Sequence, residues 1–299
     1  MKTVLITGAF GFLGQRLLKR LAADAEYRPV AVTSRRNTAS FPKGIVVECA
    51  DLLDPASVQQ LMECVRPDVC VHLAWDQRDA GYRNSPSNYQ WAAASLSLFA
   101  AFQACGGRQF LFAGTSGEYE GQSETAPPMS LYGRCKRAVS ELLLDTGKQA
   151  GIQVQIPRYF TIYGPGETHA FGAIPSAICS LLNGRTFACK SPSAIRDYIY
   201  IEDAADATIC LLNSDYEGAV DIGSGIPRSM REVFDEIARQ LGRPELISYG
   251  SETGLKTTLV ADPRTMREHL HPTPQTDFSS GIANSIAYWQ TQLGADTHD

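Results

Sequence analysis

The chain has 299 residues, of which 44% are hydrophobic and 20% are charged, as is typical of a globular protein with one or two domains. Its formal net charge of −5 argues against a broad surface for nucleic acid or another polyanion. No stretch approaches the roughly 20 consecutive apolar residues that a membrane span requires. We therefore expect a cytoplasmic protein with neither a nucleic-acid partner nor a membrane segment.

The eight cysteines and five histidines do not have the spacing of a metal site. There is no C-x-x-C pair, and most cysteines stand inside apolar strand or helix patterns. We expect reduced, buried thiols and no bound metal.

The first 160 residues alternate between short apolar runs and longer helical patterns. Strands are expected at 3–7, 29–33, 45–48, 68–73, 109–113 and 152–156, and helices at 12–23, 57–65, 89–105 and 131–149. Apolar strands that alternate with helices indicate parallel βαβ units, whose crossovers are right-handed. The sequence therefore predicts an α/β fold with a doubly wound parallel Rossmann sheet.

After residue 160 the pattern is less regular. Glycine and proline cluster at 164–166 and 223–227, with helical stretches near 175–182 and 204–213 and a strand-like run at 198–201. We expect residues 1–163 to form a dinucleotide-binding domain to which residues 195–225 return. Residues 164–194 and 226–299 are expected to form mainly a smaller, substrate-binding lobe.

Three glycines, each three residues apart, follow the first strand and open the first helix. In this setting the loop amides and the helix N-terminus can hold a pyrophosphate. The predicted cofactor-binding residues of this turn are Gly8, Phe10, Gly11, Phe12, Leu13 and Gly14.

The end of the second strand carries Arg35 and Arg36 and no acidic residue. NAD-selective sites usually place Asp or Glu there for the ribose 2′-hydroxyl, whereas arginines suit a 2′-phosphate. We therefore expect NADP(H) as the cofactor. Asp51, after the third strand, is placed to contact the adenine amino group, with Leu52 beside it.

Tyr132 and Lys136 stand one helical turn apart on the same face of a predicted helix. A free tyrosine has a pKa of about 10, so acid–base work near neutrality requires a lower value, and the lysine ammonium is expected to supply part of it. Thr115 follows the fifth strand at its carboxyl end, where it can hold the substrate oxygen that Tyr132 protonates. Ser116 is its rival, and Glu118 is expected on the loop surface.

These segments together resemble an extended short-chain dehydrogenase/reductase of the nucleotide-sugar epimerase/dehydratase/reductase superfamily. The resemblance covers nearly the whole chain and includes TGAFGFLG at 7–14, HLA at 72–74, YGRCK at 132–136, RYFTIYGPG at 158–166 and RDYIYIED at 196–203. The segments stand in the order that the family shows.

The resemblance implies roles for further residues. It places Leu73 and Ala74 along the cofactor, Tyr159 and Thr161 on the nicotinamide and sugar side, and Arg196 on the substrate diphosphate. It also implies that Lys136 binds the nicotinamide ribose and that two long helices form a homodimer. His169 and Arg78, both in loops, are further substrate-binding candidates.

The chain departs from the family pattern at three places. Sugar dehydratases carry an Asp-Glu pair after the hydroxyl residue, whereas this chain has Ser116-Gly117, which argues against dehydration. Thr161 and the run at 92–94 (AAA) replace asparagines that the family usually has, so the pose of the substrate stays open.

We expect NADPH-dependent reduction of a keto group on a nucleotide-linked deoxysugar, as in NDP-sugar 4-ketoreductases, with Tyr132 as the general acid. An epimerase with tightly held NAD is the alternative. A reductase for a small non-nucleotide ketone or aldehyde also stays open, as does a non-catalytic NADP-sensing or scaffold protein.

Overall fold

A computed structural model describes residues 1–34, 45–121, 123, 126, 129–167, 172–250, 257–270 and 276–295. Within these residues the larger sheet has eight strands, and all of its pairings are parallel. The strands are β1 (Lys2–Thr7), β2 (Tyr27–Thr33), β3 (Val46–Cys49), β4 (Val69–His72), β5 (Gln109–Phe112), β6 (Gly114–Thr115), β7 (Gln153–Tyr159) and β11 (Gly218–Ile222). Their order is β11-β7-β5-β4-β1-β2-β3, with β6 beside β7. The chain runs outward from β1 in both directions, so the predicted doubly wound Rossmann sheet is confirmed.

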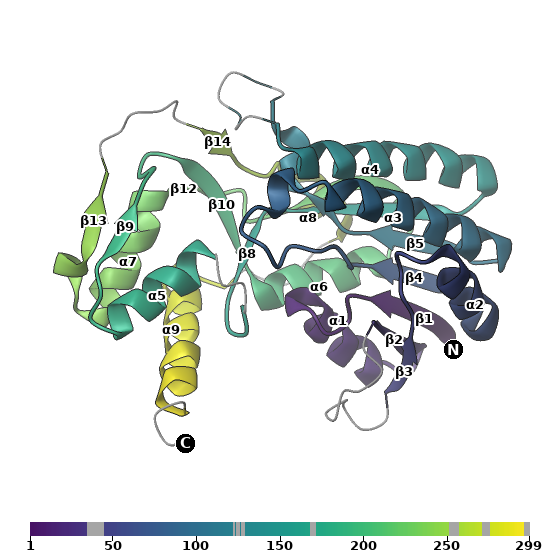
Figure 1. Cartoon of the computed structure of the whole chain (residues 1–299), viewed down its shortest axis with the longest axis horizontal. Coiled ribbons are helices and arrows are strands. Elements are labelled where there is room, and N and C mark those ends of the chain that lie inside the picture. The colour runs from purple at the N-terminus through teal and green to yellow at the C-terminus, as the bar shows by residue number, and fades with distance from the viewer. Residues whose placement is uncertain are drawn as a thin grey trace.

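Helices cover both faces of this sheet (Figure 1). One face carries α1 (Phe12–Ala23), α6 (Ile201–Leu212) and α8 (Arg264–Leu270), and the other carries α2 (Pro55–Val65), α3 (Ser87–Ala104) and α4 (Leu131–Ala150). Successive strand residues point to opposite faces, so Val4 and Ile6 enter the first core and Leu5 the second. None of the described helices is long and apolar enough to cross a membrane. The homodimer expected through two long helices stays a prediction.

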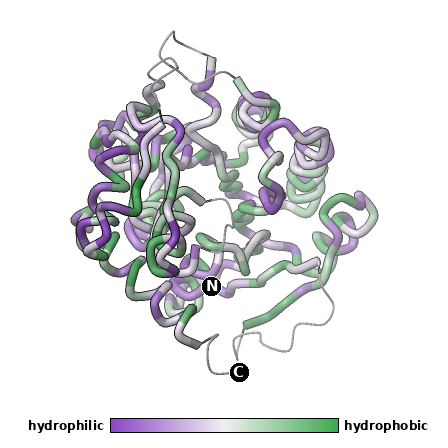
Figure 2. The backbone as a smooth tube through the Cα atoms, turned by 60° about the vertical axis from the view of Figure 1, so that its left-hand side comes forward, coloured by the Kyte–Doolittle hydropathy of each residue, from purple (hydrophilic) through white to green (hydrophobic). Residues whose placement is uncertain are grey.

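A second, smaller lobe lies at the left of Figure 1 and holds the C-terminus. Its strands are β8 (Thr161–Tyr163), β9 (Phe187–Cys189), β10 (Ile195–Tyr200), β12 (Pro227–Ser229), β13 (Ile247–Tyr249) and β14 (Thr258–Leu259), and its helices are α5 (Ala173–Leu182), α7 (Met230–Leu241) and α9 (Phe278–Ala295). Side chains such as Tyr163, Ile178 and Phe234 form a core of its own. Figure 2 shows hydrophilic and hydrophobic residues interspersed along the helices, as expected for elements with one face on a core.

The segment 195–225, expected to return to the larger sheet, divides between the two lobes. In it, α6 packs on α1 and β11 joins the larger sheet, whereas β10 pairs with β8, β12 and β14 in the smaller lobe. The boundary between a dinucleotide-binding and a substrate-binding domain therefore stays a prediction.

Helix α7 was not expected from the sequence, although its signals are present. Ser229 accepts a hydrogen bond from the Glu232 amide at 3.2 Å, and the Glu232 carboxylate accepts one from the Ser229 amide at 2.6 Å. This reciprocal capping box opens α7, and Gly242 ends it at a positive φ of 65°.

The cysteines differ from the expectation of buried thiols. Cys70, Cys135 and Cys189 are buried, whereas Cys49 and Cys64 are exposed. Cys49 ends β3, the edge strand of the larger sheet, which explains its exposure.

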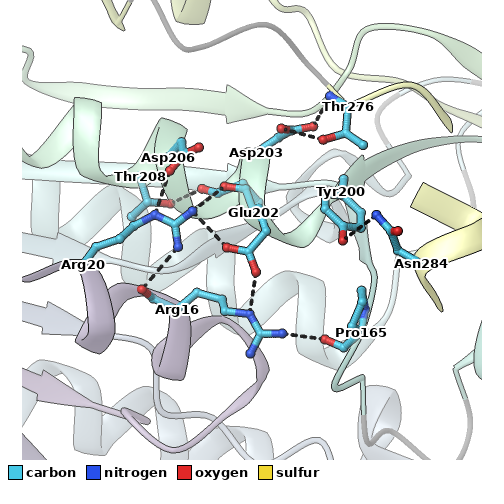
Figure 3. A network of polar contacts seen from close by, with 11 residues as sticks. Arg16, Arg20, Pro165, Tyr200, Glu202, Asp203, Asp206, Thr208, Thr276 and Asn284 are labelled. Atoms are coloured by element: carbon cyan, nitrogen blue, oxygen red, sulfur yellow. Dashed lines mark hydrogen bonds and ion pairs between the residues drawn. The ribbon is translucent and has the colours of Figure 1, made fainter. Parts of the chain in front are cut away.

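Ion pairs tie α1 to α6, and a hydrogen bond ties α1 to the loop that enters the smaller lobe (Figure 3). Arg16 Nε lies 2.8 Å from Glu202 Oε1, and Arg20 contacts both Glu202 and Asp206 at 2.9 and 2.6 Å. Arg16 Nη2 also donates to the Pro165 carbonyl at 2.7 Å. The helix that opens at the glycine turn is therefore fixed against the entry to the smaller lobe.

Candidate functional site

The glycine turn between β1 and α1 leaves no room for side chains at two positions. A Cβ on Gly8 would lie 2.9 Å from the Ala74 nitrogen, and Gly8 has a positive φ of 69°. A Cβ on Gly14 would lie 2.1 Å from the Gly8 carbonyl oxygen. The Gly11 amide closes the turn by donating to that same oxygen at 2.9 Å. Close packing of backbone against backbone therefore explains the glycine spacing.

This turn fits a dinucleotide pyrophosphate. Gly11, the N-cap of α1, has no side chain to accept from the first helical amides, which leaves them for an anion. In space, the turn lies beside the point where β1 and β4 are neighbours in the sheet. The strand order reverses at this point, and ligands bind there in such sheets. Leu73 and Ala74, at the end of β4, lie directly against Gly8. The Phe12 side chain packs against the core of the smaller lobe, and the Leu13 side chain packs against the cores of both lobes.

A hollow of about 290 Å³ lies between the start of α2 and α3, and predicted cofactor residue Leu52 is part of its lining. It is lined by Leu52, Leu53, Pro55, Gln90, Ala93, Ala94 and Ser97. Asp51 beside it is exposed, and its Oδ1 accepts from the Leu53 amide at 2.9 Å. Arg35 and Arg36 lie outside the described residues, so the choice between NAD and NADP stays a prediction.

Tyr132 stands in the first turn of α4, beside Thr115 at the end of β6. The Ser130 hydroxyl caps the helix by accepting from the Gly133 amide at 3.1 Å, and Tyr132 is 5% exposed. Burial raises the pKa of Tyr132 above its ordinary value, and a hydrogen bond with the Thr115 hydroxyl acts in the opposite direction. Among the described residues burial outweighs the polar neighbours, so the lowering of this pKa that catalysis requires stays a prediction.

The Lys136 side chain is held by groups at the ends of β4 and β5. Its Nζ donates to the Ala113 carbonyl at 2.7 Å and lies 4.1 Å from the Trp75 ring centroid and 4.3 Å from that of Phe112. Burial lowers the pKa of Lys136 to about 7, and the Glu118 charge opposes this shift. The backbone and two aromatic rings thus fix the ammonium.

Two residues after β4 that the sequence reasoning missed lie against Tyr132. Gln77 Nε2 donates to Tyr132 Oη at 2.8 Å, and the Trp75 ring stands edge-on to the Tyr132 ring with centroids 5.9 Å apart. Arg78, the candidate that the sequence offers in this loop, has a side chain that is 80% exposed and pairs with Asp76. Position after a central parallel strand was the available signal.

Glu118 is buried, and its prediction as a surface residue is wrong. It lies in the 3₁₀ helix η2 (Ser116–Tyr119), where its carboxylate accepts from the Thr115 amide at 3.1 Å and from Arg158 Nε at 2.9 Å. The Ser140 hydroxyl also donates to it at 3.3 Å. The capping box with Thr115 turns this side chain inward, and the ion pair with Arg158 makes its burial tolerable.

A second buried carboxylate holds the start of α4. Glu120 accepts from the Ser130 amide and hydroxyl at 2.9 and 2.7 Å and pairs with Arg83 of the 3₁₀ helix η1 (Tyr82–Asn84). The charge of Arg83 lowers the pKa of both Tyr132 and Arg196. A cation therefore lies within electrostatic reach of both residues.

Arg196, at the start of β10, has a guanidinium held by neutral groups. It donates to the carbonyls of Ile195 and Thr257 at 2.7 and 2.9 Å and to the Thr257 hydroxyl at 2.9 Å. In the described part of the chain it pairs with no carboxylate, and burial lowers its pKa. Its charge is therefore available for an anion such as a diphosphate.

The remaining predicted site residues differ in how far they are exposed. The Tyr159 side chain points into the core under α6, where its hydroxyl lies 2.8 Å from that of Thr208, so it does not line an open site. Thr161 is exposed at the start of β8, and Ser116 is half-buried at the start of η2. His169 lies outside the described residues.

Known proteins resemble this chain over almost its whole length. A UDP-glucose 4-epimerase from Rhizobium meliloti (strain 1021) is 28% identical, and the alignment covers 97% of each chain. Two solved structures have the same fold: a UDP-glucose 4-epimerase from Thermus thermophilus in complex with NAD, and one from Thermotoga maritima with UDP-glucose. The first has a TM-score of 0.82 at 24% identity and covers 96% of this chain and 99% of its own. The second has a TM-score of 0.85 at 20% identity and covers 97% of this chain and 99% of its own.

Residues 4–223 match the sequence profile of the NAD dependent epimerase/dehydratase family. That match takes in the glycine turn after β1, Thr115 at the end of β6, Tyr132 of α4 and Arg196 of β10. The chain belongs to the NAD dependent epimerase/dehydratase family.

Proposed function

We propose that the protein is a nucleotide-sugar epimerase that uses NAD bound at the Gly8–Gly14 turn. The observation that carries this proposal is that Tyr132 lies beside Thr115, at the carboxyl ends of the strands, where the glycine turn also lies. The relative from Rhizobium meliloti supports it, because a UDP-glucose 4-epimerase aligns over 97% of both chains. Epimerisation thus replaces ketoreduction, the first expectation from the sequence, as the leading candidate.

In this proposal the chain moves a proton while it holds the sugar. Tyr132 Oη takes the proton of a sugar hydroxyl as the hydrogen on the same carbon leaves, and a keto sugar results. When bound, the nicotinamide cofactor supplies the acceptor and donor for that hydride. The keto sugar would then turn its other face to the cofactor and take the hydride back, and Tyr132 would return the proton to the oxygen, which gives the epimer.

Other side chains hold the reacting groups. The Thr115 hydroxyl binds the reacting oxygen, and Arg196 binds the diphosphate through charge-assisted hydrogen bonds. Lys136 has three N–H donors, of which one is directed to the Ala113 carbonyl, so two are left for ribose hydroxyls. Ser116 and Thr161 are proposed to contact the sugar.

NADPH-dependent reduction of a keto nucleotide sugar is the second candidate. Arg35 and Arg36 favour it, because arginines after the second strand suit a ribose 2′-phosphate. Tyr132 would then donate its proton once, to the oxygen of the keto group.

Cofactor titration followed by a product assay separates the two. NAD⁺ and NADPH are titrated into the purified protein by calorimetry, and UDP-glucose is then incubated with the protein and NAD⁺. Formation of the C4 epimer without net change of cofactor supports the epimerase. Tight NADPH binding, with NADPH consumed by a 4-keto nucleotide sugar and no epimer formed, supports the reductase instead.

A further inference from the structure

The catalytic tyrosine receives a hydrogen bond from a loop glutamine. Gln77 Nε2 lies 2.8 Å from Tyr132 Oη and donates to it, although the two residues are 55 positions apart in the sequence. Lys136, one turn further along α4, donates instead to the Ala113 carbonyl at 2.7 Å. The phenol oxygen is therefore contacted by an amide from the loop after β4 as well as by the Thr115 hydroxyl.

Contacts of its neighbours order the loop around Gln77. Trp75 Nε1 donates to Asn88 Oδ1 of α3 at 2.9 Å. The Arg78 amide and guanidinium both donate to the Asp76 carboxylate, which closes a short turn. Gln77 stands between Asp76 and Arg78 and is half-buried, so its side chain has a defined direction toward α4.

An N–H donor at this oxygen favours the phenolate over the phenol. A hydrogen bond to a charged acceptor is stronger than one to its neutral form, so the donor stabilises the base more than the acid. The charged and titratable groups that act on Tyr132 are Tyr82 and Arg83 of η1 and Glu118 of η2. Lys136 of α4 lies over the Trp75 ring, which in turn contacts the Tyr132 ring. Tyr82 and Glu118 disfavour the phenolate, while Arg83 and the Thr115 hydroxyl favour it.

We infer that Gln77 is a positioning residue for the proposed reaction, which holds the Tyr132 hydroxyl and stabilises its ionised form by direct N–H donation. This inference rests on the proposed proton transfer by Tyr132. It assigns to the loop after β4 a part that the sequence pattern alone gives to Lys136.

The first test reads the contact without any need for activity. The chain is labelled with ¹³C at the tyrosine ζ carbon, and the Tyr132 resonance is assigned by its loss in Tyr132→Phe. This resonance is expected to shift in Gln77→Leu and to stay unchanged in Gln59→Leu, which removes an exposed glutamine of α2. An unchanged resonance in Gln77→Leu, with the fold intact by circular dichroism, overturns the inference.

The second test reads the consequence for catalysis. In Gln77→Leu the rising limb of the pH profile of kcat is expected to move to higher pH by about one unit, the shift that loss of one charge-assisted hydrogen bond produces. Gln77→Lys keeps an N–H donor and is expected to restore the limb to the wild-type position or below it. A uniform loss of kcat at every pH in Gln77→Leu indicates a merely structural role and contradicts the inference.

The two proposals fail in different ways. In one case the Tyr132 resonance shifts in Gln77→Leu, but the wild-type protein forms no epimer and consumes no NADPH. The Gln77–Tyr132 contact then stands, whereas the proposed proton-transfer chemistry and the inference that rests on it are overturned. In the other case the wild-type protein is active, but Gln77→Leu changes neither the Tyr132 resonance nor the pH profile. Only the role of Gln77 is then overturned.

Discussion

Arg158 on β7 and Glu118 on η2 form an ion pair, with Nε and Oε2 2.9 Å apart and the Glu118 side chain 1% exposed. Glu118 also accepts the amide of Thr115, so the pair fixes the segment that presents the Thr115 hydroxyl to Tyr132. The position of the Thr115 hydroxyl therefore depends on the charge of Arg158, which lies 40 residues from Glu118 in the sequence.

Removal of one partner of this ion pair is expected to destabilise the fold strongly. Arg158→Met leaves the buried Glu118 carboxylate without its cation, and such changes typically cost about 3–5 kcal/mol of unfolding free energy. Urea unfolding measures the loss. Arg137→Met, which breaks the exposed pair with Glu141, is the control and is expected to cost less than about 0.5 kcal/mol. Equal losses in both variants contradict the structural role of Glu118.

Gly14→Ala is expected to abolish cofactor binding and weaken the fold. The new Cβ would lie 2.1 Å from the Gly8 carbonyl oxygen, so the turn must open. Overpacking of this kind costs about 1–3 kcal/mol. Calorimetric titration with NAD⁺ and urea unfolding measure the two effects. Gly294→Ala in α9, where a Cβ meets nothing within 4 Å, is the matched control and is expected to leave both unchanged.

Tyr132→Phe is expected to remove activity and to leave cofactor affinity intact. The phenol oxygen is the proposed proton carrier, and loss of a general acid–base group lowers kcat about 10²–10⁴-fold. Initial rates of epimer formation and NAD⁺ titration give the two readouts. Tyr89→Phe, on the exposed side of α3, is expected to keep wild-type rates. Retained activity in Tyr132→Phe contradicts the proposed mechanism.

Arg196→Met is expected to raise the KM for the nucleotide sugar without changing cofactor affinity. Hydrogen bonds to charged groups contribute about 1.5–3 kcal/mol, which corresponds to a rise of roughly 10- to 100-fold. Steady-state kinetics with varied UDP-glucose measure the effect. Arg239→Met, an exposed residue of α7 paired with Glu236, should leave KM at the wild-type value. A normal KM in Arg196→Met indicates that the diphosphate binds elsewhere.

Glu167, in the loop that enters the smaller lobe, is expected to make stability fall as pH rises. Burial raises its pKa to about 8 from the ordinary value of 4.5. Between these values the folded chain keeps a proton that the unfolded chain has lost, so the free energy of unfolding decreases as pH rises through this window. The decrease should be smaller in Glu167→Gln, as measured by urea unfolding at about pH 5 and pH 8.

The control for this pH effect is Glu63→Gln, on the exposed side of α2. It is expected to show the same decrease between the two pH values as the wild type. If Glu167→Gln also behaves like the wild type, the carboxyl does not hold its proton in the folded chain.

Sequence by itself determined the Rossmann sheet and the glycine turn, because both follow from local sterics and from periodic apolar burial. Buried parallel strands such as β1 and β4 need apolar residues at consecutive positions, and the backbone contact between Gly8 and Gly14 excludes side chains. The placement of Tyr132 on the first turn of a helix followed from the same local pattern.

Only the tertiary structure decided which groups surround Tyr132. Gln77 and Arg158 reach their partners across 55 and 40 residues, and no local pattern encodes such pairings. The same holds for the Lys136 ammonium, which donates to the Ala113 carbonyl and lies over two aromatic rings. Its position four residues after Tyr132 does not predict these contacts. Helical spacing places Tyr132 and Lys136 on one face, but burial and the competing acceptors of neighbouring strands and loops determine what each side chain contacts.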